Sequence, residues 1–277
     1  MKKKLVFALG AVIALIFGAS LLVSGCAQQE KADAASQSAK LKIEVPVNVT
    51  YLGHSAVKLE SGEKTVLVDP WIKDNPKCPV KLEDIKAADL ILVTHDHFDH
   101  VGDTIALAKA TGATVVAMPE TAAKLQADGL PAEQVVFGGM GQNIGNENIV
   151  KDIGIIMTEA FHSSETGLPA GYIIKFPGGA TVYHAGDTGI FANMETLAEL
   201  YPIHLAFLPI GGTFTMDSYQ AAKSLSLIKP AIVIPVHYAT FPVLAENAGS
   251  FIELAKKEAP QVEVKALNPG ESYTLSQ

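Results

Sequence analysis

Hydrophobic and polar residues alternate along most of the chain from about Leu41 onward, and short β-branched runs recur within that pattern. The alternation predicts strands at Val47–Leu52, Ala56–Leu59, Thr65–Val68 and Leu90–Thr94. A helical period then predicts helices at Thr104–Ala110 and Glu120–Ala127, with a strand at Thr114–Ala117 between them. This part of the chain is therefore β-rich first and α/β afterwards.

The same order returns after about Lys151. The predicted elements there are strands at Ile153–Ala160, Tyr172–Phe176 and Thr181–His184, a helix at Met194–Leu200, a strand at His204–Leu208, a helix at Ser218–Leu227 and a strand at Ala231–Pro235. Two such halves bury their apolar faces best when their sheets pack together. The predicted fold class is therefore α/β, with two mixed β-sheets face to face and helices outside.

The N-terminus departs from this pattern. Three lysines at positions 2–4 precede an uncharged apolar stretch, residues 5–23, which is typical of an export signal. The sequence Val-Ser-Gly-Cys that ends at Cys26 resembles the bacterial lipoprotein cleavage box. That resemblance implies that Cys26 is lipidated and holds the mature protein to a membrane, outside the cytoplasm. The stretch is also long enough to act as an uncleaved membrane anchor, which is the alternative.

Residues 26–40 contain no large apolar side chain and predict a flexible tether. The predicted organisation is a signal peptide at 1–25, a tether at 26–40 and one folded domain at 41–277. With Cys26 lipidated, Cys78 is the other cysteine of the chain, so no intrachain disulfide framework is expected.

Composition narrows the range of partners. The chain is 48% hydrophobic and 18% charged, which is typical of a globular protein. Its formal net charge is -8 and it contains no arginine. Nucleic acid is not expected as a partner, because binding its phosphates needs a basic surface. A small-molecule substrate is expected instead.

The run His95–His100 reads His-Asp-His-Phe-Asp-His and follows an apolar strand. Imidazole and carboxylate groups bind divalent metals, and so many of them within six residues cannot all reach one tetrahedral ion. Two adjacent ions are therefore predicted. Three further candidate ligands, His162, Asp187 and His237, each follow a predicted strand downstream.

These residues belong to motifs that resemble the metallo-β-lactamase superfamily, and within it the lactonase-like group of uncharacterised metal-dependent hydrolases (UPF0173-like). The resemblance spans about Val47 to Tyr273. Its motifs are Tyr51–Ser55, Leu67–Pro70, Thr94–Gly102, His162–Ser164, Pro169–Tyr172, Tyr183–Gly189, Leu208–Gly212 and Pro235–Tyr238.

The resemblance implies an αββα sandwich with two metal ions at one edge. It implies that one ion is held by His95, His97 and His162, and the second by Asp99, His100 and His237. Asp187 is implied to bridge them. The nitrogen and oxygen ligands suit Zn first, with Mn or Fe also compatible.

Two such ions would activate a metal-bridging hydroxide, with Asp99 orienting it, for attack on a small lactone, ester, amide or phosphoester. Three alternatives compete with this prediction. A metallo-phosphodiesterase or nuclease would use the same ions, although this chain lacks a basic track. A β-lactamase fits the downstream motifs less well. A lipoprotein that binds a metal or ligand without catalysis is the third.

Other polar residues are predicted near this centre with less support. Asp69 follows a strand and either supports the metal loop by hydrogen bonding or caps a turn. His54 and His184 are predicted to line the pocket or to hold ligands by hydrogen bonds rather than to bind metal themselves.

The remaining candidates are weaker. Trp71 and Phe98 are candidates for an apolar pocket wall. Thr213 and Thr215 follow two glycines and either bind substrate oxygens or, as the favoured reading, cap the next helix. His204 precedes an apolar strand and is predicted to be structural.

Overall fold

The computed structural model describes residues 42–276, and residues 43–276 fall within one compact unit. The predicted signal peptide, the tether and Cys26 lie outside the described residues. None of the described helices is both long and apolar enough to cross a membrane.

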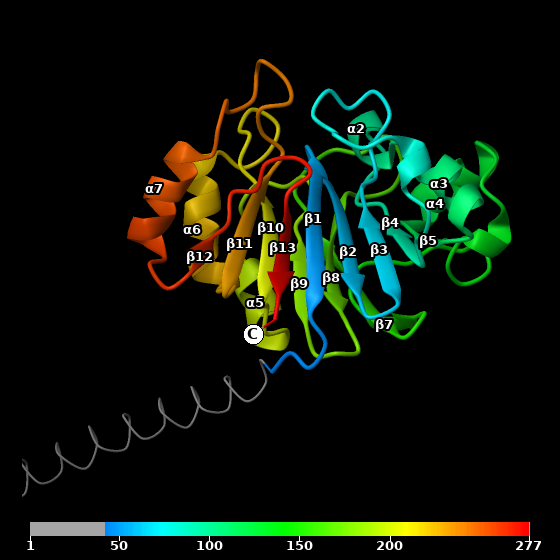
Figure 1. The fold of residues 1–277 in the computed structure, drawn as a ribbon, viewed down its shortest axis with the longest axis horizontal. Helices are drawn as coiled ribbons and strands as arrows, with labels where there is room; N and C mark the ends of the chain where they lie inside the picture. The colour runs from blue at the N-terminus through cyan, green and yellow to red at the C-terminus, as the bar shows by residue number, and fades with distance from the viewer. Residues whose placement is uncertain (1–41, 277) are drawn as a thin grey trace, which may run out of the picture. The chain divides into compact units, whose positions relative to one another are not determined.

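Two mixed sheets form the centre of the fold (Figure 1). The first sheet has the strand order β13-β1-β2-β3-β4-β5 and the second has the order β12-β11-β10-β9-β8-β7-β6. The strands of the first sheet are β1 (Val47–Gly53), β2 (Ala56–Ser61), β3 (Lys64–Val68), β4 (Leu90–Leu92), β5 (Thr114–Val116) and β13 (Ser272–Leu275). Those of the second are β6 (Glu147–Val150), β7 (Ile153–Glu159), β8 (Ala170–Lys175), β9 (Thr181–His184), β10 (Leu205–Pro209), β11 (Ile232–Val236) and β12 (Glu263–Val264).

Each sheet combines an antiparallel part with a parallel part. Strands β1 to β3 pair antiparallel, whereas β3 to β5 pair parallel. In the second sheet β6 to β9 pair antiparallel and β9 to β12 pair parallel. The parallel strands β10 and β11 are buried along their whole length, as expected for strands covered on both faces. This repetition confirms the predicted fold class.

The main core lies between the sheets. Alternate residues of β1, Val47, Val49 and Tyr51, pack there against side chains of β7, β8 and β10. Tyr172 of β8 joins the two sheets, because its hydroxyl donates to the carbonyls of Val93 (2.8 Å) and Val116 (3.0 Å). This contact fixes the ends of β4 and β5 relative to the second sheet.

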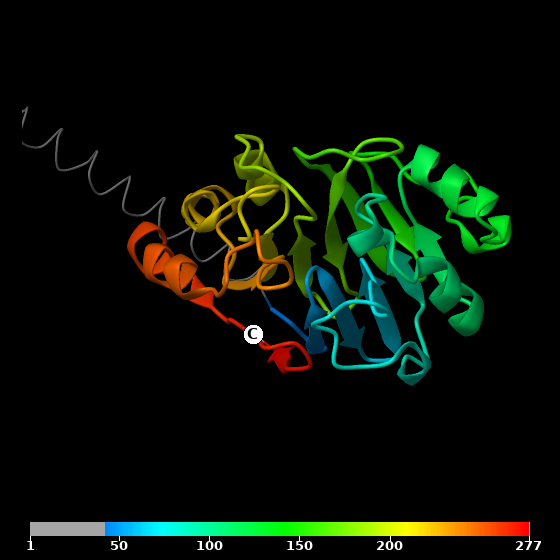
Figure 2. The same ribbon diagram turned by 90° about the horizontal axis from the view of Figure 1, so that it is seen from above.

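The helices lie mainly at the two ends of the sandwich (Figure 2). They are α2 (Phe98–Val101), α3 (Thr104–Thr111), α4 (Pro119–Ala127), α5 (Met194–Leu200), α6 (Ser218–Ile228) and α7 (Gly249–Glu258). Apolar residues of α3 and α4 pack on β4 and β5, while those of α6 and α7 pack on β10 and β11.

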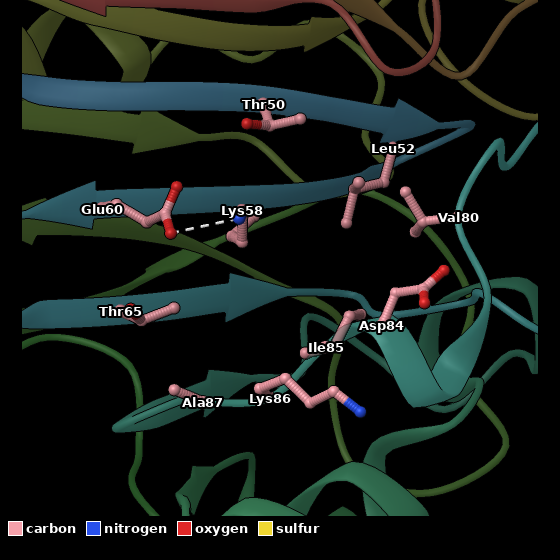
Figure 3. Close-up of a pocket in the computed structure, with 10 residues that line it drawn as sticks. All are labelled: Thr50, Leu52, Lys58, Glu60, Thr65, Val80, Asp84, Ile85, Lys86 and Ala87. Atoms are coloured by element: carbon pink, nitrogen blue, oxygen red, sulfur yellow. Dashed lines mark ion pairs between the residues drawn. The ribbon is translucent and has the colours of Figure 1, made fainter.

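Among the described residues, no α-helix covers the outer face of β1 to β3. The segment between β3 and β4 borders that face instead. This segment and the face of β1 to β3 together line a hollow of about 280 Å³ (Figure 3). An ion pair between Lys58 and Glu60, both of β2 and 3.1 Å apart, lies along one wall of this hollow.

The predicted strands and helices agree with the structure to within about two residues at most ends. The elements that the pattern did not predict are the short helix α2, the strands β6, β12 and β13, and the helix α7. In β6 and β13 only the last residue is buried. Their sequences therefore carry little of the apolar alternation that predicts a strand.

Candidate metal centre

The predicted ligands meet at one edge of the sandwich, where the parallel strands end. His95–His100 follow β4 of the first sheet, with α2 beginning at Phe98. His162 follows β7, Asp187 follows β9 and His237 follows β11, all in the second sheet. Strands β7, β9 and β11 run in the same direction, so the topology brings their ends to one edge.

The first group of ligand atoms contains three imidazole nitrogens. His97 Nδ1 lies 3.0 Å from His95 Nε2 and 3.3 Å from His162 Nε2. Thr94 gives its hydroxyl hydrogen to Asp69 at 2.7 Å, so its oxygen accepts from His95 Nδ1 at 3.0 Å. In a neutral imidazole one ring nitrogen carries the hydrogen and the other carries a lone pair. Since His95 Nδ1 carries the hydrogen, His95 Nε2 carries the lone pair.

His162 is fixed in the same tautomer by a different partner. Its Nδ1–H donates to the carbonyl of Phe214 at 3.1 Å, so Nε2 carries the lone pair. Burial, followed by the charge of His97, outweighs the attraction of Asp187 and lowers the pKa of His162. His162 is therefore neutral and presents a lone pair toward His97.

The second group is built around His100 and His237. His100 is fully buried, and its Nδ1 donates to Asp69 Oδ2 at 2.8 Å. His100 Nε2 then points at Asp187 Oδ2, 3.3 Å away, and His237 Nε2 lies 3.0 Å from the same oxygen. Asp69 thus holds a ligand histidine by hydrogen bonding, in the way expected of a carboxylate behind a metal ligand.

Asp187 lies between the two groups. Its Oδ2 is also 3.5 Å from His162 Nε2, which belongs to the first group. Its Oδ1 is buried and has no hydrogen-bond partner among the described residues. Burial raises the pKa of Asp187, but the nearby His100 and His237 outweigh it and hold that pKa well below the usual value. Asp187 therefore offers one carboxylate to both groups.

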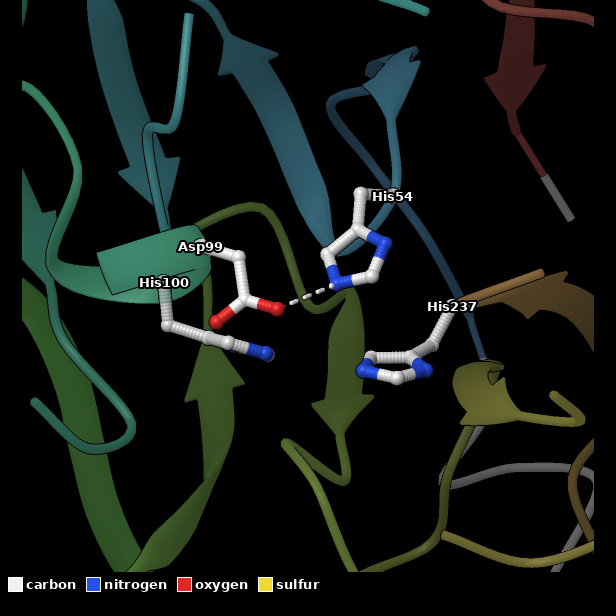
Figure 4. Close-up of side chains that lie close together, drawn as sticks. All are labelled: His54, Asp99, His100 and His237. Carbon is white, nitrogen blue, oxygen red and sulfur yellow. Dashed lines mark hydrogen bonds and ion pairs between the residues drawn. The ribbon is translucent and has the colours of Figure 1, made fainter. Parts of the chain in front are cut away.

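Asp99 completes the second group together with a residue that was not predicted as a ligand (Figure 4). His54 Nε2 lies 3.2 Å from Asp99 Oδ2, and His54 Nδ1 lies 3.0 Å from the hydroxyl of Thr240. Each of four residues, His54, Asp99, His100 and His237, contributes one nitrogen or oxygen atom to a cluster. These four atoms all lie within 4.8 Å of one another. Burial first, and then the charges of His237 and His100, lower the pKa of His54 to about 4. His54 is therefore a neutral imidazole beside the Asp99 carboxylate.

These side chains fit divalent cations. Burial, with the charge of His100, lowers the pKa of His95 to about 3, so protonation does not relieve its contact with His97. His97 Nδ1 carries at most one hydrogen, so it cannot satisfy the lone pairs of both His95 Nε2 and His162 Nε2, whereas a cation among the three nitrogens satisfies all of them. Asp187 Oδ1 and His100 Nε2 are buried without a hydrogen bond, the latter with only its 3.3 Å ion-pair contact to Asp187 Oδ2, and a cation would satisfy both. Six of the eight histidines belong to such groups.

Three residues at this edge have a strained backbone. His54, Asp69 and His237 have φ angles of 58°, 47° and 57°, in the left-handed region that side chains other than glycine rarely adopt. The amide of His237 donates to the carbonyl of His54 at 2.8 Å, which joins two of the strained residues across the sheets. A Cβ at Gly211 would lie 2.1 Å from the carbonyl oxygen of His237, so only glycine fits beside this ligand.

Asp96 was not predicted as a site residue, although it belongs to the run His95–His100. It is 3% exposed and points away from the ligand atoms into the loop after His162. Its Oδ1 accepts from the Ser164 hydroxyl (2.6 Å) and the Glu165 amide (2.7 Å), and its Oδ2 accepts from the Thr166 hydroxyl (2.5 Å). Asp96 therefore ties the loop of the first sheet to the loop that carries His162. Its position between two ligand histidines was the available signal.

Three other supporting groups carried no sequence signal. The Phe214 carbonyl is backbone, and any residue would supply it. Thr94 and Thr240 are ordinary hydroxyl residues whose roles depend on the rings that the fold brings to them.

The weaker predictions have mixed outcomes. His184 is buried, donates from Nε2 to the Ser55 carbonyl (3.0 Å) and accepts the Gly186 amide at Nδ1 (3.2 Å), so it positions the loop before Asp187. His204 accepts the amide of Thr181 at the opposite ends of the strands, away from the ligands.

The predicted cap formed by Thr213 or Thr215 is wrong. Their hydroxyls donate to carbonyls of Val243 (3.2 Å) and Met216 (3.4 Å). Asp217 caps α6 instead, because its carboxylate accepts the Gln220 amide at 2.8 Å. The loop needs several residues after the two glycines before the backbone becomes helical.

A cavity of about 320 Å³ opens over the ligands. Its lining residues are His97, Phe98, Asp99, His162, Ser163, Asp187, Phe214 and His237. Two of them, Phe98 and Phe214, are exposed aromatic side chains (66% and 57%). The cavity is therefore large enough for a small molecule and has polar ligands at its base with apolar groups at its mouth.

Comparison with known proteins gives consistent results. Residues 64–238 match a family model described as a beta-lactamase superfamily domain. A protein named "UPF0173 metal-dependent hydrolase" from Nitratidesulfovibrio vulgaris (strain DP4) is 48% identical over 227 residues, covering 82% of this chain and 95% of its own length. One of the same name from Korarchaeum cryptofilum is 45% identical over 230 residues, covering 83% and 100%.

A solved structure is also similar. Igni18, described as a novel metallo hydrolase from Ignicoccus hospitalis, has a TM-score of 0.75 and 39% identity. The likeness covers 83% of this chain and 98% of Igni18. In these three comparisons about four fifths of this chain and nearly all of the similar protein are matched.

Proposed function

Because the chain belongs to the metallo-β-lactamase superfamily and is a metal-dependent hydrolase of that family, we propose that it is a two-metal hydrolase of small lactones, esters, amides or phosphoesters. One observation carries the two-metal part of this proposal. Asp187 Oδ2 lies 3.0 to 3.5 Å from imidazole nitrogens of both ligand groups, so one carboxylate serves two sets of lone pairs.

The first ion would be held by His95, His97 and His162, and the second by Asp99, His100 and His237, with Asp187 shared. His54 is an additional candidate for the second ion. Imidazole and carboxylate ligands bind Zn well and also admit Mn or Fe, so Zn is the proposed metal. Divalent ions bound at these atoms supply Lewis acidity and lower the pKa of water toward neutrality.

Asp99 is the residue proposed to orient the attacking water. Its side chain is 14% exposed and lines the cavity, so it lies between the ligands and the solvent. Burial raises the pKa of Asp99, but the hydrogen bond from His54 and the charge of His100 outweigh it and hold the pKa below its usual value. The carboxylate is therefore ionised at neutral pH and able to accept a hydrogen bond from water.

The size and charge of the molecule support a small substrate. The cavity over the ligands has a volume of about 320 Å³, and the chain has a net charge of -8 without arginine. A nuclease would need cationic side chains along a track for phosphates. The acidic chain therefore favours the lactone, ester, amide or phosphomonoester range over nucleic acid.

The test is a substrate screen on the full-length protein loaded separately with Zn, Mn or Fe, with metal content measured for each preparation. We expect turnover of at least one small ester, lactone, amide or phosphoester, and its loss on chelation and in Asp99→Ala. Unchanged activity in Asp99→Ala would refute the mechanism. Turnover of polynucleotides alone would favour a nuclease, and bound metal without any turnover would favour a binding protein.

We also propose that Cys26 is lipidated and anchors the protein to a membrane outside the cytoplasm. The support is the charged, apolar and small-residue order of residues 1–26 and the absence of large apolar residues from 27 to 40. Metabolic labelling with a fatty acid and cell fractionation test it. The chain should take up label and sediment with membranes, and Cys26→Ala should do neither. A labelled Cys26→Ala protein would contradict the proposal.

A further inference from the structure

A second cavity adjoins the metal centre on the side of Phe98. Its volume is about 480 Å³, and its lining residues are Trp71, Lys73, Asp74, Pro76, Phe98, Gly102, Asp103 and Phe241. Phe98 is the one residue among these that also lines the cavity over the ligands. Phe98 lies between the ligands His97 and Asp99 in the chain. The two cavities are therefore neighbours, separated by the Phe98 side chain.

Three aromatic rings form one wall of this second cavity, which we call the aromatic pocket. Trp71 and Phe241 are stacked, with ring centroids 5.9 Å apart and planes at 21°. Phe98 meets Trp71 edge-on at 5.6 Å and Phe241 at 6.4 Å. Such a wall presents apolar faces and edges suited to an aryl or alkyl group.

The aromatic pocket is also joined to the metal centre through His54. The His54 ring meets Trp71 at 5.4 Å and Phe241 at 5.5 Å, and its Nε2 contacts Asp99. The wall therefore rests on the histidine that holds the proposed catalytic carboxylate. A group bound in the pocket would lie beside the reacting end of the same substrate.

The polar groups of the pocket favour an uncharged occupant. Asp103 already accepts the amides of Ile72 (2.8 Å) and Lys73 (2.7 Å). The opposite charges of Lys73 and Asp74 lie side by side and are both exposed.

From these contacts we propose that the aromatic pocket is a subsite for an uncharged aryl or alkyl substituent of the substrate, whose scissile group lies over the ligands on the other side of Phe98. The inference rests on the proposed hydrolase function and deepens it by naming the substrate class. It also accounts for the exposure of Phe98, 66% of whose surface is accessible although it lies within the ligand run.

The test uses the single tryptophan of the chain, Trp71, whose fluorescence reports on the pocket without any need for turnover. The full-length, metal-loaded protein is titrated with γ-butyrolactone and with the same lactone carrying a butyl or a phenyl group. We expect the substituted lactones to change Trp71 emission with saturation and to bind roughly tenfold or more tightly than the parent. Equal affinity for all three lactones would overturn the proposal.

Variants locate the effect. Phe241→Ala should weaken binding of the phenyl lactone roughly tenfold and leave the parent lactone unchanged, while Phe241→Leu should retain part of the preference. Phe161→Ala is the control, because Phe161 is a phenylalanine next to the ligand His162 that lines neither cavity, although it is more exposed (62%) than the half-buried Phe241. If Phe241→Ala does not fold, as judged by melting temperature and metal content, the reduced preference of Phe241→Leu for the phenyl lactone takes its place. Equal losses in Phe161→Ala and Phe241→Ala would overturn the proposal.

The outcomes separate this inference from the proposed function. Substituent-dependent binding without hydrolysis would support the subsite and count against lactonase chemistry. Hydrolysis with the same kcat/KM for all three lactones would support the hydrolase and overturn the subsite. Binding of phosphatidylglycerol vesicles that shifts Trp71 emission, with no response to any lactone, would instead identify the aromatic wall as a membrane contact and overturn it too.

Discussion

The first sheet contributes its ligands in one run, His95–His100, whereas the second contributes three single residues, His162, Asp187 and His237, on three different strand ends. In the run, the short helix α2 and its neighbours set the relative positions of the ligands locally. Each single residue instead depends on contacts made by other segments. The second half of the centre should therefore be more sensitive to changes outside the ligands.

The supporting contacts differ in the same way. Asp69 and Thr94 hold His100 and His95 within the first sheet. The His162 loop is held by the Asp96 carboxylate and the Phe214 carbonyl, and His237 by Gly211 and the His54 carbonyl. The Asp187 loop is held by His184 of the preceding strand, whose Nε2 is fixed in turn by the Ser55 carbonyl of the first sheet. Placing a dispersed ligand thus takes several tertiary contacts.

Removal of metal breaks both halves at once and should have the largest effect. Chelation should abolish hydrolysis and lower the melting temperature, because ions that bind only the folded state stabilise it by about 2.7 kcal/mol at a hundredfold excess over Kd. For a domain of this size that is a shift of roughly 5 to 10 °C. Calorimetry with and without chelator measures it, and re-addition of metal should restore it. An unchanged melting temperature would count against a built metal centre.

Loss of the shared carboxylate compares the halves directly. Asp187→Asn should reduce kcat/KM by more than about 100-fold, since even carboxylates behind the ligands typically account for 10- to 100-fold. Because Asp187 contacts both groups, metal content should fall for both ions. Asp99→Asn, which touches only the second group, should leave about one ion per chain. Elemental analysis distinguishes these results, and equal metal content in the two variants would refute a shared role.

Asp96 tests the link between the halves. Asp96→Ala removes the acceptors of the Ser164, Glu165 and Thr166 donors while leaving every ligand in place. Activity should fall roughly 10- to 100-fold with weaker metal binding. Glu165→Gln, an exposed change in the same loop, is the control and should stay near wild type. Equal effects of the two changes would show that the loop needs no tether.

Gly211→Ala gives the smallest predicted effect and sharpens the comparison at His237. The added Cβ would lie 2.1 Å from the His237 carbonyl oxygen, so backbone must move, at a cost of roughly 1–3 kcal/mol in unfolding free energy. Gly189→Ala is the matched control, because its Cβ would meet its nearest neighbour at 4.0 Å. Urea denaturation should separate the two variants, and equal midpoints would show that this loop adapts freely.

Most of the central elements were predictable from the sequence, because buried strands such as β10 and β11 carry long apolar runs. The missed strands are edge strands: β6 pairs with β7 at the edge of the second sheet, and β13 pairs with β1 at the edge of the first. Only one residue of each is buried, so their pairing is decided by the backbone of the neighbouring strand. Helix α7 was missed although its buried residues Phe251 and Ala255 are four positions apart, the spacing of one helix face, so a signal was present there.

The sequence by itself determined which residue types carry the chemistry. It placed the ligand run behind a buried strand and identified His162, Asp187 and His237 as ligand candidates, because imidazole and carboxylate groups at strand ends are recognisable in one dimension. The tertiary structure alone decided which lone pairs face each other, through tautomers set by Thr94, Asp69 and the Phe214 carbonyl. It also brought His54 to Asp99, Asp96 to the His162 loop and Phe241 to Trp71. These contacts join residues up to about 190 positions apart, as His54 and Thr240 show with a separation of 186, and no local pattern encodes them.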